Sequence, residues 1–378
     1  MKLLFWAAFV AVLYTYFGYP FLVWVFARMR PRPIKQEAIF PSVSMIIAAY
    51  NEEKVIGGKM ANTMALAYPE GQLEIIVVAD GSTDQTVSIA QSYEKQGVTV
   101  LYRPLRQGKT AALNHAVSSA KGEIVFFSDA NTMYEPTVIQ KIVRNFHDPS
   151  VGGVSGRKVI LKDSERQTSQ GETAFWNYEG WLKSKESHLG SIVGADGEIF
   201  AIRKNLFSPM SPNIVHDDMF LSLKIVEAGF RVIYEGEATS AEYSSKTLHD
   251  EFFLKVRYAS AGYQILSEFR RMFLPPKTIF AFQFISHKLF RWLIPFFLLA
   301  MLFTSAMISS LWYQSLFWGQ ISFYLAAVLG WVLMEKLGRT NIFYVPLYFC
   351  MGNAAALYGF FRHFFSAGQT SLWRKAER

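Results

Sequence analysis

The segment VSMIIAAYNE, residues 43–52, is a short apolar run followed directly by polar residues. Three similar apolar runs follow it along the chain, at Ile75 to Ala79, Val98 to Tyr102 and Ile124 to Phe127. Helical patterns lie between them, at 85–94 and 110–120. Short apolar runs that alternate with helices are typical of a parallel sheet covered on both faces. The sequence therefore predicts an α/β fold.

Polar residues follow three of the predicted strands. They occupy positions 49–52 (AYNE), 80–84 (DGSTD) and 128–131 (SDAN). Taken singly, such a loop is better explained as the start of a capped helix, with Gly81 turning the chain and Ser82 or Thr83 as the cap. Ligands of parallel sheets, however, bind beyond the carboxyl ends of the strands. Because spacing does not give the strand order, we infer the meeting of the three loops from the parallel pattern alone.

The composition indicates a membrane protein with a sizeable water-facing part. Hydrophobic residues make up 51% of the chain and charged residues only 18%, against roughly 25% charge in average soluble domains. Disordered and collagen-like chains are excluded. The net charge of +8 comes from basic residues beside apolar segments, where anionic lipid explains them better than nucleic acid. The single cysteine, Cys350, allows no internal disulfide, which fits a domain facing reducing cytosol.

The N-terminal segment Leu3 to Phe26 is uncharged and is long enough to cross a hydrocarbon core of about 30 Å. A signal peptide is the alternative, but no small-residue cleavage site precedes Arg28. Basic residues follow at once, so the positive-inside rule places the next part of the chain in the cytoplasm. We therefore expect an integral membrane protein with a cytoplasmic domain.

The C-terminal third contains three more apolar runs, at 289–311, 321–334 and 342–361, preceded by an expected interfacial helix at 280–292. If all spanned, the basic tail with Trp373, Arg374, Lys375 and Arg378 would lie outside, against the positive-inside rule. Either one late segment is re-entrant or the tail breaks the rule. The expected division is a membrane helix (1–27), a cytoplasmic domain (28–277), interfacial and membrane helices (278–366) and a basic tail (367–378).

Six short blocks in the cytoplasmic part resemble the membrane-embedded family-two inverting glycosyltransferases, which include hyaluronan, cellulose and poly-N-acetylglucosamine synthases. The blocks are AAYNE (48–52), ADGSTD (79–84), GKTAALN (108–114), SDAN (128–131), GADGEIFAIR (194–203) and HDDMFL (216–221). The resemblance covers most of Pro41 to Gln264. It implies a GT-A fold, which is Rossmann-like with a mostly parallel sheet, flanked by transmembrane helices.

The resemblance implies a site for a UDP-sugar donor. Tyr50, Glu52 and Asp80 match the nucleoside clamp, with Asp80 accepting hydrogen bonds from the uracil edge. Lys109 would supply a point charge for the diphosphate. Its alternative is a solvated lysine at the start of a helix.

Asp129 and Asn131 occupy the position of the family's DxD motif, which binds a hard cation through oxygen ligands. The resemblance therefore implies Mg²⁺ or Mn²⁺. The second residue here is Asn, a neutral ligand, so we expect weaker cation affinity unless phosphates or another carboxylate compensate. Asn131 could instead cap a helix ahead of Pro136.

His216-Asp217-Asp218 stands where relatives carry Thr-Glu-Asp. Inverting transfer needs one carboxylate that takes the proton of the attacking hydroxyl. Asp218 matches that base, and Asp217 would be a supporting carboxylate. Both could also belong to the cap of the amphipathic helix 219–228.

Relatives that synthesise polymers carry QxxRW near the membrane, where this chain has LKVRY at 254–258. The resemblance assigns Arg257 to the donor diphosphate and Tyr258 to the acceptor, although Arg257 could face lipid headgroups instead. Trp176 and Trp181 offer aromatic faces to an acceptor sugar, or anchor the domain at the interface. Asp196 is expected near the acceptor.

The preferred function is inverting transfer of a sugar from a UDP-sugar to a growing polysaccharide at the membrane. A non-processive lipid glycosyltransferase is the first alternative, and a degenerate non-catalytic subunit of a polysaccharide complex is the second. The expected partners are the donor, a polysaccharide or lipid acceptor and membrane lipids, and no nucleic acid.

Overall fold

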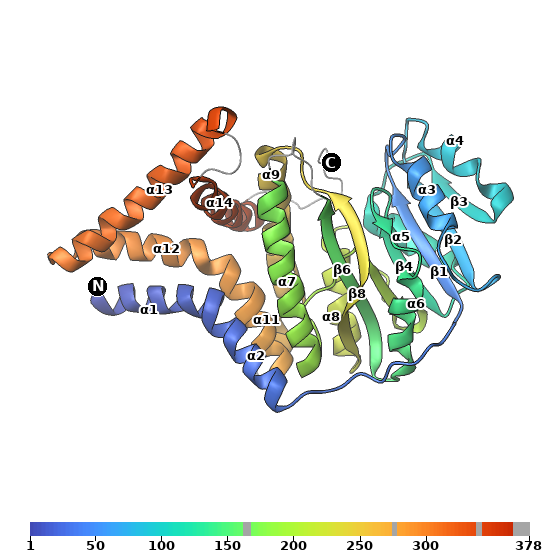
Figure 1. Ribbon diagram of the computed structural model, residues 1–378, viewed down its shortest axis with the longest axis horizontal. Coiled ribbons are helices and arrows are strands. Elements are labelled where there is room, and N and C mark those ends of the chain that lie inside the picture. Colours follow the sequence, from blue (N-terminus) through green and yellow to red (C-terminus); the bar gives the residue numbers. More distant parts are fainter. Residues whose placement is uncertain (162–167, 274–277, 338–341, 366–378) are drawn as a thin grey trace.

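The computed structural model describes residues 1–161, 168–273, 278–337 and 342–365. An α/β domain lies at one side of the molecule and long apolar helices at the other, with α7 (Ser169–Leu189) and α9 (Leu248–Glu268) between them (Figure 1). The predicted basic tail, with Trp373, Arg374, Lys375 and Arg378, lies outside the described residues.

The first half of the domain confirms the predicted parallel sheet. Four strands run parallel, in the order β3-β2-β1-β4, with β1 paired to both β2 and β4. Each predicted strand is present and extends by one to three residues, as β1 (Val43–Ala49), β2 (Leu73–Asp80), β3 (Val98–Arg103) and β4 (Ile124–Asp129). The register pairs Ala48 with Asp129 and Ala49 with Ala79, so the polar loops leave the sheet at one edge.

The second half of the sheet was not predicted. Within the described residues the sheet continues β4-β7-β6-β8-β5. These strands are β5 (Met133–Tyr134), β6 (Val151–Leu161), β7 (Phe200–Arg203) and β8 (Arg231–Tyr243). Strand β7 is antiparallel to both of its neighbours. Because β7 runs the opposite way, the GADGE segment before it reaches the edge where β1, β2 and β4 end.

Helices cover both faces of the sheet. Alternate side chains of a strand point to opposite faces, so Ile46 and Val125 enter one buried cluster while Ile47 and Phe126 enter the other. The helices of this domain are α3 (Ile56–Met64), α4 (Thr86–Gln91), α5 (Lys109–Ser119), α6 (Val138–Val143) and α8 (Asp217–Glu227), with short turns at Glu94–Gln96, Arg144–His147, Lys204–Leu206 and α10 (Arg270–Phe273).

Three helical segments of the described chain are long and apolar enough to cross a membrane: Lys2–Met29, Ile279–Met307 and Leu311–Leu333. The first comprises α1 (Lys2–Leu13), a π-helical turn η1 (Tyr14–Gly18) and α2 (Tyr19–Met29), and the second comprises α11 (Ile279–Phe284), a π-helical turn η5 (Ile285–Leu289) and α12 (Phe290–Met307). The third lies in α13 (Leu311–Leu337). The stretch expected as a separate interfacial helix, 280–292, is thus continuous with the second segment.

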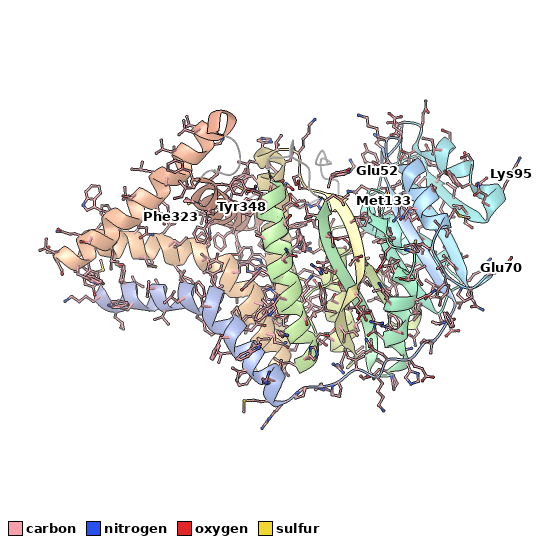
Figure 2. The ribbon with its side chains drawn as sticks, in the orientation of Figure 1. Glu52, Glu70, Lys95, Met133, Phe323 and Tyr348 are labelled. Carbon is pink, nitrogen blue, oxygen red and sulfur yellow. The ribbon has the colours of Figure 1, made fainter. Side chains whose placement is uncertain are left out.

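Helix α14 (Tyr344–Phe365) corresponds to the last predicted span but is not among those three segments. It crosses α9 closely, since a Cβ added to Gly359 would lie 2.7 Å from the Cβ of Ala259. Tyr348 on α14 accordingly lies beside the upper part of α7 and α9 (Figure 2). Helix α14 therefore connects the apolar helices to the α/β domain.

Candidate active site

The loops after β1 and β2 are tied to each other, as the parallel pattern led us to expect. The side-chain oxygen of Asn51 accepts a hydrogen bond from the Thr83 amide at 2.9 Å, and the Asn51 amide donates to the Ser82 hydroxyl at 3.2 Å. Asn51 adopts a positive φ of 52°, a conformation that Asn tolerates better than most residues. This pairing holds the two loops at one edge of the sheet.

Asp80 organises the loop that leads to Lys109. It is buried, and its carboxylate accepts hydrogen bonds from the amides of Gln107 at 3.0 Å and Gly108 at 2.6 Å. Gly81 has a positive φ of 71°, and a Cβ there would lie 2.7 Å from the Arg106 amide nitrogen. Only glycine permits this approach. The contact of Asp80 with a nucleobase stays a prediction.

Tyr50 and Glu52 lie at the end of β1. The guanidinium carbon of Arg106 lies 3.8 Å from the centre of the Tyr50 ring, an arrangement that combines cation–π attraction with flat stacking. The Glu52 amide donates to the Thr86 hydroxyl at 2.7 Å, and Figure 2 shows Glu52 at the upper edge of the sheet. Arg106 and Tyr50 thus form a planar surface suited to a nucleobase. Arg106 was not among the residues predicted from the sequence.

Lys109 joins the predicted cation site to the predicted catalytic loop. Its ammonium lies 2.9 Å from Asp129 Oδ1 and 3.5 Å from Asp217 Oδ2. Burial alone would lower the pKa of Lys109, but the charges of Asp129 and Asp217 raise the pKa above its ordinary value. Lys109 is therefore a fixed positive charge within an acidic cluster.

The two catalytic candidates face different sides. The Oδ2 atom of Asp218 accepts from the Gly197 amide at 3.1 Å, while Oδ1 accepts from the Met219 amide at 2.7 Å and lies 3.3 Å from His216 Nδ1. Burial raises the pKa of Asp217. The positive charge of Lys109 lowers this pKa, whereas the like charges of Asp218 and Asp129 raise it further. Asp217 therefore belongs to the Lys109 cluster.

Asp218 is held ionised. Burial would raise the pKa of its carboxyl, but the hydrogen bond and charge of His216, followed by the charge of Lys109, lower the pKa well below the usual range. Helix α8 begins at Asp217, with His216 at the N-cap and no capping side chain, so the cap alternative does not describe Asp218. His216, which the sequence gave no reason to select, also stacks on Tyr258 at 5.2 Å.

Asp129 and Asn131, the predicted cation ligands, would offer two oxygen ligands to a cation, and Asp129 is paired with Lys109. The Asn131 amide nitrogen donates to Glu242 at 3.3 Å, which leaves its oxygen as a ligand atom. Helix α6 has Thr137 at its N-cap, so Asn131 caps no helix there. Among the described residues no three His, Cys, Asp or Glu side chains are grouped to hold a metal. Magnesium commonly takes one or two protein oxygens and completes its shell with phosphates and water.

A cavity of about 450 Å³ lies between the α/β domain and the apolar helices. It brings together four predicted residues, Asp218, Asp196, Trp176 and Tyr258. The opposite walls come from η1, α12 and α14 and include Tyr16, Arg291, Trp292, Phe349, Asn353 and Ala356. Asp218 thus faces a chamber walled by the α/β domain on one side and by the long apolar helices on the other.

Trp181 and Arg257, predicted for the acceptor and for the donor diphosphate, do not line this cavity, and neither do the predicted donor residues around Lys109. Trp181 is 42% exposed on α7, where Lys185 lies 6.0 Å from its ring. Arg257 lies beside Tyr258 on α9, with its guanidinium 5.5 Å from that ring. We therefore assign no acceptor contact to Trp181, and the donor role of Arg257 stays a prediction.

Several polar residues that the sequence did not single out also line the cavity, among them Lys158, Lys183 and Glu198. Lys183 pairs with Asp196 at 2.5 Å, and Lys158 lies 3.4 Å from Glu198 and 4.5 Å from the centre of the Trp176 ring. Burial raises the pKa of Glu198 to about 7, against the opposing charge of Lys158. Glu198 follows Asp196 closely in the GADGE block, which was a usable signal, whereas Lys158 sits in an ordinary strand pattern.

Sequence relatives agree with this architecture. Residues 44–209 match the family described as glycosyl transferase family 2. A beta-monoglucosyldiacylglycerol synthase of a Nostoc species is 30% identical over 57% of this chain and 48% of its own length. A poly-beta-1,6-N-acetyl-D-glucosamine synthase of Staphylococcus aureus is 26% identical over 51% of this chain and 48% of its own length. The chain thus spans about half the length of these curated relatives.

A solved structure shares the whole fold. The mannosyltransferase PcManGT of Pyrobaculum calidifontis, solved with GDP-Man and Mn²⁺, superposes with a TM-score of 0.71 and 22% identity over 96% of this chain and 99% of its own. This likeness extends through the apolar helices as well as the sheet. On the family match, the strand order and the loops at the sheet edge, residues 44–209 form a glycosyl transferase family 2 domain with a GT-A fold.

Proposed function

We propose that this protein is an inverting glycosyltransferase that moves a sugar from a nucleoside diphosphate donor to a lipid acceptor held in the cavity. One observation carries the proposal: Asp218 lines the cavity while its neighbour Asp217 contacts Lys109 in the predicted donor cluster. Two adjacent carboxylates therefore face the two halves of a transfer reaction.

On the donor side, the Tyr50 and Arg106 surface suits the nucleobase and Lys109 suits the diphosphate. Asp129 and Asn131 would hold Mg²⁺ or Mn²⁺, which when bound neutralises phosphate charge. The resemblance favours a UDP-sugar, whereas the solved relative holds GDP-Man. The donor screen below therefore includes both nucleotides.

On the acceptor side, Asp218 takes the proton of the acceptor hydroxyl as its oxygen attacks the anomeric carbon. The new carbon–oxygen bond forms as the bond to the diphosphate breaks, so the nucleoside diphosphate leaves from the opposite face and the anomeric configuration inverts. Asp218 is ionised at neutral pH because His216 and Lys109 lower its pKa. Asp217 positions Lys109 through their ion pair.

A lipid acceptor suits the cavity better than a growing polymer, which was the sequence-based preference. Its volume of about 450 Å³ lies within the range of sites for small molecules, roughly 300 to 1,000 Å³. The helices with apolar character that wall it contribute Trp292, Phe349 and Ala356 as apolar lining residues. The glucosyldiacylglycerol synthase among the relatives supports a lipid, and the poly-N-acetylglucosamine synthase keeps a polymer as the second candidate.

We further propose that the three candidate spans cross the membrane and that the α/β domain is cytoplasmic. With the N-terminus outside, three spans return the chain to the cytoplasmic side before α14. The packing of α14 on α9 fits that side. Three spans also remove the conflict between four spans and the positive-inside rule.

The test incubates the purified full chain with Mn²⁺, a lipid extract and labelled UDP-sugars or GDP-mannose. A single labelled lipid supports the proposal. A ladder of long products supports a polysaccharide synthase. Donor binding without any product supports the non-catalytic alternative. An inverted anomeric configuration, read by NMR of the product, is required for the mechanism.

A further inference from the structure

Three basic residues occur within one of the apolar segments. His287, Lys288 and Arg291 all lie in the candidate span Ile279–Met307, on or directly after the π-helical turn η5. Ionisable side chains within such a segment are costly and usually serve a function, and π-helical turns frequently occur at functional sites. The proposed catalytic steps use none of the three.

All three residues converge on Glu179 of α7. His287 Nε2 lies 3.2 Å and Lys288 Nζ 3.3 Å from its carboxylate, and Arg291 forms an ion pair with the same group. His287 also contacts Glu186 through Nδ1 at 2.7 Å, and Glu186 accepts a further hydrogen bond from Tyr19 at 2.5 Å. Glu186 therefore contacts His287 and Tyr19, whereas Glu179 is the carboxylate that pairs with both Lys288 and Arg291.

The two cations that line this end of the cavity, Lys288 and Arg291, share one carboxylate. In the part of the chain that the structure describes, Glu179 is the carboxylate within 4.0 Å of Lys288 or Arg291. The other cations lining the cavity each have a carboxylate elsewhere: Lys183 has Asp196, Lys255 has Glu251, and Lys158 has Glu198 and Glu242.

The side chain of Arg291 is held at the cavity wall and stays partly exposed, with 20% of its surface accessible. Its Nε is buried and has no hydrogen-bond partner, although a buried polar group without a partner costs free energy. The rings of Phe175 and Tyr178 lie 5.9 and 5.7 Å from the guanidinium, which restrains its plane. A restrained and partly exposed guanidinium beside a partly exposed ammonium is suited to bind a phosphate.

Position then selects the kind of phosphate. Lys288, Arg291 and Glu179 line the same cavity as Asp218, next to apolar side chains such as Phe349 and Ala356. Trp176 and Asp196 line it on the α/β side. An acceptor that meets apolar helices, then cations, then aromatic and catalytic groups would carry an apolar chain, a phosphate and a hydroxylated headgroup in that order.

We propose that Lys288 and Arg291 bind the phosphate of an acceptor lipid in which the phosphate links the apolar chains to the hydroxylated headgroup. The proposal rests on the lipid acceptor proposed above and narrows it to phosphate-bearing lipids. Glu179 is then the counterion of both cations when no lipid is bound, and it competes with the phosphate for them.

The test measures lipid binding to the full chain in detergent, without donor, so that it does not depend on transfer. The probes are short-chain phosphatidylinositol, which has a phosphate before its polyol, and short-chain monoglucosyldiacylglycerol, which has none. Since the phosphate adds charged hydrogen bonds that the neutral lipid lacks, we expect the phosphate lipid to bind at least about tenfold more tightly. Arg291→Gln and Lys288→Gln should each remove most of that preference and leave the neutral lipid unchanged.

Matched variants separate phosphate binding from a structural role. Lys185→Gln, on α7 outside the cavity lining, should change neither affinity. Glu179→Gln removes the competing carboxylate, so it should tighten binding of the phosphate lipid, whereas a purely structural cluster would lose binding of both lipids. Arg291→Lys keeps the charge and serves as the milder variant if Arg291→Gln does not fold.

Equal affinity for the two lipids in the unaltered protein would overturn the proposal, as would an equal loss of both in Arg291→Gln. Inorganic phosphate should compete only weakly; if it bound as tightly as the lipid, the site would be one for free anions and the lipid assignment would fail. Phosphate-selective binding without sugar transfer to any lipid would refute the proposed function and leave this site standing.

Discussion

The ammonium of Lys109 lies 2.9 Å from the carboxylate of Asp129. Lys109 is the first residue of α5, and Asp129 is the last residue of β4. The same ammonium lies 3.5 Å from Asp217. A positive charge therefore holds together an acidic cluster that would otherwise repel itself and the donor.

Replacing Lys109 should weaken donor binding. Lys109→Ala removes the fixed charge and leaves Asp129 and Asp217 facing the diphosphate, so we expect donor affinity to fall by about tenfold to a hundredfold. Isothermal titration with the donor nucleotide measures it. Lys224→Ala, on the exposed pair with Glu227, is the control. An unaltered affinity would remove Lys109 from the donor site.

Replacing Asp218 should stop transfer but spare donor binding. Asp218→Asn keeps the shape of the side chain and removes the proton acceptor, so kcat should fall by about 10²–10⁴-fold. Single-turnover assays measure the rate, and titration measures donor affinity. Glu227→Gln, at the other end of α8, should leave both values unchanged. Normal turnover in Asp218→Asn would assign the base elsewhere.

Cation binding should depend on the donor diphosphate. Because Asp129 and Asn131 offer few protein ligands and Lys109 already pairs with Asp129, Mn²⁺ should bind at least about tenfold more tightly when a nucleoside diphosphate is present. Electron paramagnetic resonance of free Mn²⁺ measures this difference. Asp129→Asn should abolish it. Tight Mn²⁺ binding without nucleotide would contradict the shared site.

The buried pair of Glu172 and Glu251 should make stability decrease with rising pH. Burial, followed by the charge of Glu251, raises the pKa of Glu172 to about 7 from an ordinary 4.5. The folded state therefore binds this proton more tightly than the unfolded state, so the stabilisation is complete below pH 4.5 and is lost as pH rises to about 7.

Thermal unfolding between pH 5 and 8 tests this linkage. Glu172→Gln should flatten the decline of Tm and raise Tm most at pH 8. Its side chain keeps an acceptor oxygen for the Ser245 amide, which donates at 2.9 Å. Glu227→Gln, on an exposed side chain, is the control. An identical slope in Glu172→Gln would show that other groups set the pH dependence.

Gly359 should be required for the crossing of α14 and α9. A Cβ at this position would lie 2.7 Å from the Cβ of Ala259 and 3.0 Å from the carbonyl oxygen of Val256, so Gly359→Ala forces the helices apart. We expect a loss of about 1–3 kcal/mol and a lower Tm in detergent. Gly319→Ala, in α13 with nothing within 4 Å of the added Cβ, should be neutral or mildly stabilising.

Much of the donor half could be predicted from the sequence. Strands β1 to β4 and the loops that follow them are local features, because an apolar run bounded by turn residues has few other ways to bury itself. The long apolar segments were equally visible in composition. The spacing of the motifs does not show which strands pair with each other. The antiparallel strand β7, which brings Asp196 and Glu198 to the site, was therefore not predicted.

The amino-acid sequence by itself determined that acidic loops follow the strands of a parallel sheet attached to apolar helices, because short-range patterns decide strands, loops and spans. Only the tertiary structure decided which side each carboxylate faces. In the folded chain, Asp80 accepts hydrogen bonds from backbone amides, and Asp217 contacts Lys109. Asp218 lines the cavity. Lys288 and Arg291 pair with Glu179. These pairings join residues far apart in the chain, so they depend on packing that no local pattern encodes.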